Sequence, residues 1–225
     1  MLLEGKNALV TGGSRGIGFQ VCRILLENGA RVLAVSRNPV SLMGAREALP
    51  GLLTLDADVS VAADSNRLAA WVQDTWGRLD ILVNNAGVSP RGGAELTTQR
   101  DDVFDDTFRT NVFGPYSCTK RLLPSLLASD DPRVVNVGSS MGIMSPDMRG
   151  VYSVSKAALH ALTVATANEL RGKVVVNALC PGWVRTDMAP DAPGDPRSSA
   201  EAALWLVTQP RAFTGKVIQG RAEVT

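Results

Sequence analysis

The sequence is poor in the residues that most metal sites, disulfide frameworks and His-dependent active sites need. It has one histidine and three cysteines in 225 residues. Cys22, Cys118 and Cys180 are odd in number, far apart and in no CxxC pair, which is typical of buried or incidental thiols in a reducing compartment. His160 has no carboxylate motif beside it. We therefore expect no metal site, and we expect His160 to be a helix-packing or surface residue rather than a catalytic base.

An excess of charge and a long apolar run are also absent. Lys and Arg number 23 against 22 Asp and Glu, so the net charge of +1 gives no electrostatic reason to expect nucleic acid or an anionic membrane as a partner. No uninterrupted apolar run has transmembrane length. Ser14, Ser139 and Ser140 stand in no G-x-S-x-G elbow, which disfavours a serine hydrolase. We expect a cytoplasmic protein whose partner is a small molecule.

What is present is an alternation of short apolar runs with longer amphipathic segments. Strands are expected at 8–10, 31–35, 52–55, 81–83, 134–137, 174–179 and 216–218, and helices at 17–28, 40–48, 61–76, 101–127, 151–171 and 198–208. Apolar, non-alternating strands separated by helices predict a parallel sheet covered on both faces. The fold class expected for residues 1–225 is therefore α/β, a single doubly wound, Rossmann-like domain.

A glycine-rich loop follows the first expected strand. Glycines at this place let the backbone turn sharply, approach a pyrophosphate and pack a helix close to the sheet, with the phosphates at the helix N-terminus. The spacing is G-x3-G-x-G rather than G-x-G-x-x-G, and a simple turn is the alternative. The residues expected to bind a dinucleotide here are Thr11, Gly12, Ser14, Arg15, Gly16, Ile17 and Gly18.

The ends of the next strands carry further candidates for a cofactor site. Many NAD-binding folds place an acidic residue after the second strand, but here Arg37 occupies that position and would receive the 2′-phosphate of NADP, helped by Arg15. The alternative is that both arginines face solvent. Asp58, followed by Val59, would accept from the adenine amino group or would cap the next helix. The fourth strand closes with small and polar residues that a cofactor would cross: Asn85, Ala86 and Gly87.

Tyr152 and Lys156 stand four residues apart in an expected helix, so both side chains lie on one face. An ammonium held beside a phenol favours the phenolate and would move the pKa of Tyr152 toward a value useful for acid/base chemistry at neutral pH. Ser139 would supply a hydroxyl for a substrate oxygen. The alternative is a surface pair at helical spacing.

In this order and spacing, the motifs resemble the compact, single-domain group of the short-chain dehydrogenase/reductase family over essentially the whole chain. The residues that carry the resemblance are Thr11-Gly12-x3-Gly16-x-Gly18, Asn84-Asn85-Ala86-Gly87, Asn111, Ser139, Tyr152-x3-Lys156, Pro181-Gly182 and Thr186. Ser139 is preferred to Ser140 because the family sets its serine thirteen residues before the tyrosine. The resemblance implies an enzyme that transfers hydride between NADP(H), with NADPH preferred over NADH, and a carbonyl or secondary alcohol.

The resemblance also implies a role for each residue at the site. Tyr152 would protonate the carbonyl oxygen while Ser139 holds that oxygen. Lys156 would bind the nicotinamide ribose, and Asn111 would fix a water that links Lys156 to solvent. Without the family, Asn111 reads as a polar residue that relieves strain in a helix. Thr186 would bind the nicotinamide carboxamide, next to Pro181 and Gly182, which are also expected at the cofactor.

Residues 187–197 contain three prolines, a glycine and three aspartates, a composition that predicts a loop without a helix of its own. The family has its substrate lid here, and this one is short, so we expect an open substrate entrance. A connection without a substrate role is the alternative. Candidate apolar lining residues of the entrance are Met141, Ile143, Met144, Trp183 and Met188.

The segments 101–127 and 151–171 are apolar on more than one side, which predicts a homo-oligomer, at least a dimer, through these helices. The C-terminal segment 219–223 is not the apolar, glycine-rich tail that is common in tetrameric relatives. The sequence therefore does not decide between a dimer and a tetramer. Two other functions are alternatives for this sequence. A catalytically silent Rossmann module that senses nucleotide or binds a protein is disfavoured by the intact catalytic set. A longer nucleotide-sugar epimerase or dehydratase needs more than 225 residues.

Overall fold

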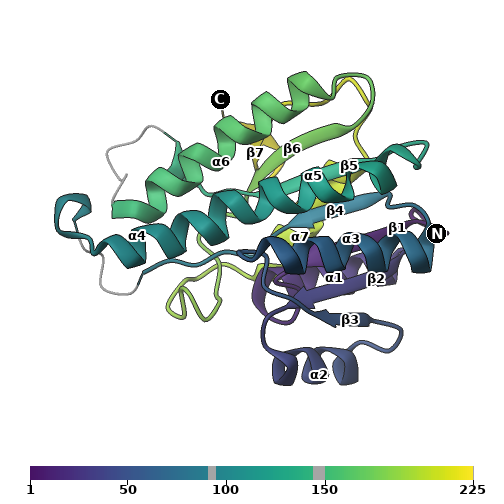
Figure 1. The fold of residues 1–225 in the computed structure, drawn as a ribbon, viewed down its shortest axis with the longest axis horizontal. Coiled ribbons are helices and arrows are strands. Elements are labelled where there is room, and N and C mark those ends of the chain that lie inside the picture. The colour runs from purple at the N-terminus through teal and green to yellow at the C-terminus, as the bar shows by residue number, and fades with distance from the viewer. Residues whose placement is uncertain (91–94, 144–149, 225) are drawn as a thin grey trace.

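The computed structural model describes residues 1–90, 95–143 and 150–224. Its centre is one eight-stranded sheet with helices on both faces, in the order β3-β2-β1-β4-β5-β6-β7-β8 (Figure 1). All neighbouring strands are parallel except the last pair, β7 and β8. The predicted single-domain, doubly wound α/β fold is confirmed. The strands are β1 Asn7–Thr11, β2 Arg31–Ser36, β3 Leu53–Asp56, β4 Ile81–Asn84, β5 Arg133–Val137, β6 Val175–Cys180, β7 Val217–Gln219 and β8 Ala222–Glu223.

Two hydrophobic layers hold the helices to the sheet. Helices α1 (Gly16–Glu27), α2 (Pro39–Ala48) and α7 (Pro196–Val207) contribute to one layer, and α3 (Ala62–Trp76), α5 (Gly114–Leu127) and α6 (Gly150–Glu169) contribute to the other. β1, β5 and β6 are buried along their whole length. Because both sides of these strands are covered, their sequences are mostly apolar and do not alternate.

The order of the strands determines where a ligand can bind. The chain moves from β1 to β2 and β3 on one side, and β4 then starts the other half of the sheet beside β1. At such a point, where the strand order reverses, the connections lead to opposite faces of the sheet. This leaves a crevice outside the carboxyl ends of the strands. The glycine-rich loop after β1 and the Asn85–Gly87 segment after β4 both lie at this edge.

The segment predicted as one helix over 101–127 is divided into three parts, so that prediction is wrong in detail. Helix α4 covers Asp101–Phe108, a π-helical turn covers Arg109–Phe113, and α5 follows. An extra residue in a helical turn breaks the regular spacing and is frequent at functional sites. Asn111 lies in this turn and is fully buried.

The C-terminal part also shows one unpredicted strand and one confirmed loop. β8 is a two-residue strand that returns antiparallel on β7 after a turn at Gly220, where φ is +62°. Residues 187–195 form no helix, as predicted, and α7 begins at Pro196 with Asp195 as its cap. In the described part of the chain, every helix is too short or too polar to cross a membrane.

Candidate active site

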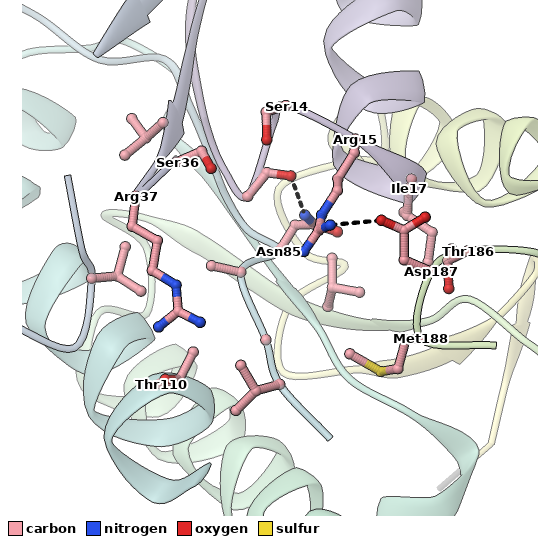
Figure 2. Close-up of a pocket in the computed structure, with 18 of the residues that line it drawn as sticks. Ser14, Arg15, Ile17, Ser36, Arg37, Asn85, Thr110, Thr186, Asp187 and Met188 are labelled. Atoms are coloured by element: carbon pink, nitrogen blue, oxygen red, sulfur yellow. Dashed lines mark hydrogen bonds and ion pairs between the residues drawn. The ribbon is translucent and has the colours of Figure 1, made fainter. Parts of the chain in front are cut away.

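A cleft of about 420 Å³ opens at the carboxyl edge of the sheet (Figure 2). Segments from across the chain line it. They are the glycine-rich loop, the end of β2 with the start of α2, the turn after β3, the segment after β4, Thr110, the end of β5, α6 and the loop after β6. The cleft therefore collects most of the residues that the sequence predicts for a cofactor, although they are spread from residue 12 to residue 186.

The end of β1 and the end of β4 are tied together under the cleft. Thr11 Oγ1 accepts hydrogen bonds from the backbone N–H groups of Asn85 and Ala86, each at 3.0 Å. Asn85 Nδ2 donates to the Thr11 and Gly12 carbonyls. A Cβ on Gly18 would lie 2.2 Å from the Gly12 carbonyl oxygen, so only glycine fits there. Thr11 and Gly18 therefore fix the conformation of the glycine-rich loop without lining the cleft themselves, while their neighbours line it.

Helix α1 begins at the cleft without a capping side chain. Its N-cap is Arg15, whose side chain makes no cap hydrogen bond, and Gly16 and Ile17 of its first turn line the cleft. The first amides of a helix lack intrahelical acceptors and carry a partial positive charge, so they bind phosphate groups. This loop, with its glycines and uncapped amides, fits the pyrophosphate of a dinucleotide.

Arg15 and Arg37 approach the cleft from two sides in Figure 2, and each has an acidic neighbour. Arg37 Nη1 lies 3.7 Å from Asp58 Oδ2, while the other oxygen of Asp58 accepts from the backbone and hydroxyl of Ser60. Arg15 Nη1 forms a 2.6 Å ion pair with Asp187 Oδ2 across the mouth of the cleft. Arg37 thus lines the cleft beside Asp58, whereas Arg15 is engaged with the loop after β6.

Several polar residues of the cleft were missed from the sequence. Ser41 Oγ donates to Ser14 Oγ at 2.9 Å, and Asn38 Oδ1 caps α2 by accepting from the Ser41 amide at 3.1 Å. Ser36 and Thr110 also line the cleft. Ser36 and Asn38 flank Arg37, which was an available signal. Ser41 lies in the first turn of α2 and Thr110 lies in the π-helical turn. No sequence motif predicts that either element borders the cleft.

Helix α6 and the end of β5 bring the predicted catalytic residues together. Tyr152 and Lys156 lie one turn apart on α6 and line the inner end of the cleft. The Tyr152 hydroxyl is hydrogen-bonded to the side chain of Ser139. The Lys156 ammonium is buried, donates to the Val137 carbonyl at 2.7 Å and lies 5.7 Å from the centre of the Tyr152 ring.

The expectation that Lys156 lowers the pKa of Tyr152 is contradicted. Burial raises the pKa of Tyr152 above its ordinary value, and only the hydrogen bond with Ser139 acts in the opposite direction. Burial also lowers the pKa of Lys156 to about 8, because the ammonium is taken out of water. Tyr152 is therefore a neutral phenol at physiological pH, in the protonation state of a general acid.

Asn111 connects the loop after β4 to α6. Its Oδ1 accepts from the Val88 amide at 2.8 Å, and its Nδ2 donates to the Val88 carbonyl at 2.9 Å and to Ser155 Oγ at 3.0 Å. Ser155 Oγ in turn donates to the Tyr152 carbonyl at 2.7 Å. A Cβ on Gly87 would meet both Asn111 Oδ1 and Lys156 Nζ. Asn111 thus braces the site, and the water relay through it stays a prediction.

The loop after β6 supplies the last predicted residues. Pro181 and Thr186 line the cleft, whereas Gly182 lies outside its lining. Of the predicted apolar residues, Met188 lines the cleft and is half exposed. Trp183 is two-thirds exposed, and Ile143 packs against the end of the sheet. Met141 is partly buried outside the cleft lining, and Met144 lies outside the described residues.

A cleft that joins a glycine-rich loop to a Tyr/Lys pair, with Ser139 hydrogen-bonded to the tyrosine, is typical of nicotinamide-dependent oxidoreductases. The sequence pattern of the short chain dehydrogenase family matches residues 6–196. The chain is 38% identical over 211 residues to a rhamnolipids biosynthesis 3-oxoacyl-[acyl-carrier-protein] reductase of Pseudomonas aeruginosa, covering 87% of this chain and 79% of that protein. It is 32% identical over 240 residues to the Vibrio harveyi 3-oxoacyl-[acyl-carrier-protein] reductase FabG, covering 97% and 96%.

Solved structures agree with these relatives. The Pseudomonas aeruginosa RhlG/NADP active-site complex superposes with a TM-score of 0.88 and 36% identity, covering 96% of this chain and 95% of that one. A Shigella flexneri short chain dehydrogenase complexed with NADP gives a TM-score of 0.89 at 28% identity. The protein belongs to the short-chain dehydrogenase/reductase family. The prediction of an NADP-dependent oxidoreductase is confirmed by the family, its named relatives and these NADP complexes.

Proposed function

We propose that the protein is a reductase that converts a ketone carbonyl to a secondary alcohol with NADPH, and that catalyses the reverse oxidation with NADP. The observation that carries this proposal is one cleft lined by Arg37, Tyr152 and Lys156, with Ser139 hydrogen-bonded to Tyr152 from outside the lining. Arg37 suits a phosphorylated ribose, and the Tyr152 group suits acid catalysis on a carbonyl oxygen.

Residues along the cleft would hold the cofactor. The amides of the Ser14–Ile17 segment would bind the pyrophosphate, and Arg37, helped by Arg15, would bind the 2′-phosphate. Asp58 and Val59 would border the adenine, and Lys156 would bind the ribose beside the nicotinamide. The remaining lining residues proposed to contact the cofactor are Asn85, Ala86, Gly87, Tyr152, Pro181 and Thr186. When bound, NADPH supplies the hydride.

Tyr152 would donate its hydroxyl proton to the carbonyl oxygen as the alcohol forms. Its raised pKa keeps the phenol protonated at neutral pH, so the acid is ready before reduction starts. Ser139, already hydrogen-bonded to Tyr152, would donate to the same oxygen and fix its position. Proton replacement would run through the Lys156 ammonium, with Asn111 holding the loop that surrounds it.

For the substrate class, we propose a 3-oxoacyl thioester. Two relatives carry the name 3-oxoacyl-[acyl-carrier-protein] reductase, which supports a ketone next to an acyl thioester. The loop 187–197 would form the rim of the substrate entrance. Trp183 and Met188 are two-thirds and half exposed beside it, and such exposed apolar side chains suit an acyl chain.

The proposal is tested by NADPH consumption with a panel of 3-oxoacyl thioesters, simple ketones, aldehydes and quinones. We expect turnover with at least one ketone and the highest kcat/KM with a 3-oxoacyl thioester. Thioesters that lack the 3-oxo group are the matched control, because they offer the same chain without the reducible carbonyl. NADPH binding without turnover on any member of the panel would instead favour the silent nucleotide-sensing module, which no observation in the structure favours.

We also propose that the protein acts in the cytoplasm as a homo-oligomer. Its three cysteines are all buried and free, which suits a reducing compartment. A groove of about 340 Å³ is lined by residues of both α5 and α6, among them Tyr116, Leu123 and Leu162. Leu122 and Leu126 on α5 are buried in the core layer against the sheet, and Leu159 on α6 is also buried, so the exposed part of this face is smaller than the sequence suggests.

A further inference from the structure

The segment Gly138–Gly142, which carries Ser139, lies directly against helix α6. A Cβ on Gly138 would lie 2.2 Å from His160 Nε2, and a Cβ on Gly142 would lie 2.6 Å from the backbone carbon of Lys156. Both positions therefore require glycine, because any side chain would push the segment away from α6. The position of Ser139 depends on this close contact.

His160 contacts both ends of that segment. Its Nε2 accepts from the Ser139 amide at 3.4 Å, and its ring is also hydrogen-bonded to the Gly142 backbone. A neutral imidazole has one donor and one acceptor nitrogen. Because Nε2 accepts from the Ser139 amide, the neutral ring carries its proton on Nδ1. The ring is 7% exposed and can form these bonds in only one tautomer.

We infer that His160 is a positioning residue for Ser139. Tyr152, Lys156 and His160 follow one another at four-residue steps on one face of α6. The first two act at the site themselves, and the third holds the segment that presents Ser139 to Tyr152. One helix therefore sets the geometry of the whole catalytic group. The catalytic consequence rests on the proposed function, whereas the tautomer of His160 does not.

The surroundings of His160 keep its ring neutral. The titratable groups that face it are Lys156 from its own helix and Cys180 of β6, whose Sγ lies 3.7 Å from Nε2. Burial lowers the pKa of His160 to about 4, and the Lys156 ammonium acts in the same direction. Nε2 is therefore available to the Ser139 amide throughout the physiological pH range, beside Cys180, which is also hydrogen-bonded to that amide. His160 acts here as a fixed polar brace and not as a base.

A double-mutant cycle tests whether His160 acts through Ser139. We expect His160→Leu to lower kcat about tenfold, since a small misplacement of a catalytic group has effects of this size, with the NADPH dissociation constant unchanged. In a Ser139→Ala background the same substitution is expected to lower kcat less than about twofold, because the group it positions is gone. If the double variant lost kcat by the product of the two single losses, the two residues would act independently, and the inference would be overturned.

Two further variants separate positioning from general destabilisation. Thr163→Val is the matched control: Thr163 is fully buried on the same helix, but it accepts from Asn136 of β5 and does not contact the Ser139 segment. It should leave kcat within about twofold of the wild type while lowering the melting temperature. His160→Gln retains an acceptor at the end of the side chain and is expected to recover most of the lost kcat. A His160→Gln variant as slow as His160→Leu would contradict the inference.

A measurement without substrate tests the same contact. His160 is the only histidine, so ¹⁵N-histidine labelling of the tag-free protein gives one unambiguous pair of ring nitrogens. We expect Nδ1 protonated and Nε2 unprotonated from pH 7 to pH 5. A ring that is protonated at Nε2, or at both nitrogens at pH 6, would overturn the inference whatever the enzyme's substrate. If this tautomer is found but the wild type consumes no NADPH with any carbonyl, the proposed function fails and the geometric part of the inference stands.

Discussion

Arg37 shows how one side chain can set cofactor choice. It is about two-thirds exposed at the end of β2, and its only charged neighbour within 4 Å among the described residues is Asp58. No acidic residue occupies positions 36–38, where a carboxylate would repel a phosphate. A charge-assisted hydrogen bond contributes roughly 1.5–3 kcal/mol, or roughly a ten- to hundredfold preference for NADPH.

Arg37→Asp is expected to reverse this preference. The new carboxylate would repel the 2′-phosphate and accept from the 2′-hydroxyl of NADH. Arg37→Gln, which removes the charge without replacing it, should bring the two cofactors close to equal. The measurement is kcat/KM for both cofactors at fixed ionic strength, because salt screens part of the effect. A wild type that prefers NADH, or an unchanged ratio in Arg37→Asp, would show that Arg37 merely faces solvent.

His160 gives a second test, through stability rather than catalysis. Its pKa is about 4 in the folded protein and about 6.5 when unfolded. Between these values the unfolded state binds a proton that the folded state does not, so this contribution to the free energy of unfolding is complete above pH 6.5 and lost as pH falls toward 4.

His160→Gln cannot titrate and should remove that dependence. We expect the difference in unfolding free energy between wild type and His160→Gln to change by roughly 2 to 3 kcal/mol from pH 7 to pH 4, with the wild type losing more. Denaturant unfolding at several pH values measures it. A difference that stays constant over this range would mean that the ring is not buried in its neutral form.

At the scale of elements, the Arg15–Asp187 ion pair joins α1 to the loop after β6. The pair spans the mouth of the cleft (Figure 2), and both side chains are about 70% exposed. Arg15 is proposed to contact the 2′-phosphate, so Asp187 competes with the cofactor for it. Exposed ion pairs contribute up to about 1 kcal/mol, which limits the competition to about fivefold.

Asp187→Asn is therefore expected to bind NADPH about two- to fivefold more tightly while binding NADH as before. Direct titration of cofactor fluorescence, without substrate, gives both dissociation constants. Asp191→Asn is the matched control, since it removes the same charge from the same loop at a residue outside the cleft lining. Equal tightening of NADPH and NADH would show that Asp187 acts on the loop and not on Arg15.

The elements also show what the sequence can and cannot reveal. Buried runs such as Val134–Val137 identify their strands because a strand covered on both faces is mostly apolar and does not alternate; Asn136 is the one polar residue of this run. The Tyr152–Lys156 spacing places both residues at the site because helix geometry alone sets it. The π-helical turn at Asn111 was missed, because one extra residue leaves no mark on the apolar pattern.

Contacts between distant segments were equally hidden from the sequence. The hydrogen bond between His160 and Ser139 depends on how closely the segment after β5 approaches α6, and that distance is set by Gly138 and Gly142. The sign of the Tyr152 pKa shift depends on burial, which outweighs the opposing hydrogen bond with Ser139. Neither quantity can be read from residue spacing, because both arise from packing around the residue.

At the scale of the whole molecule, we expect at least a dimer that buries the face formed by α5 and α6. Tyr116, Leu127 and Val164 are each about 40–50% exposed on these helices. Sedimentation at micromolar concentration should show a species heavier than the 23.8 kDa monomer. Val164→Glu should shift it toward monomer, whereas Val40→Glu, at an exposed valine on α2, should not. A wild type that sediments only as a monomer would refute the dimer.

The central claim is that Tyr152 is the proton donor in an NADPH-dependent reduction. Tyr152→Phe removes only the hydroxyl, so it should bind NADPH with nearly the wild-type dissociation constant. Loss of one general acid costs about 10²–10⁴ in rate, and kcat on the best carbonyl substrate should fall by that factor. The decisive measurement is single-turnover reduction by wild type and Tyr152→Phe, each saturated with NADPH. A Tyr152→Phe enzyme that keeps the wild-type rate would contradict the account.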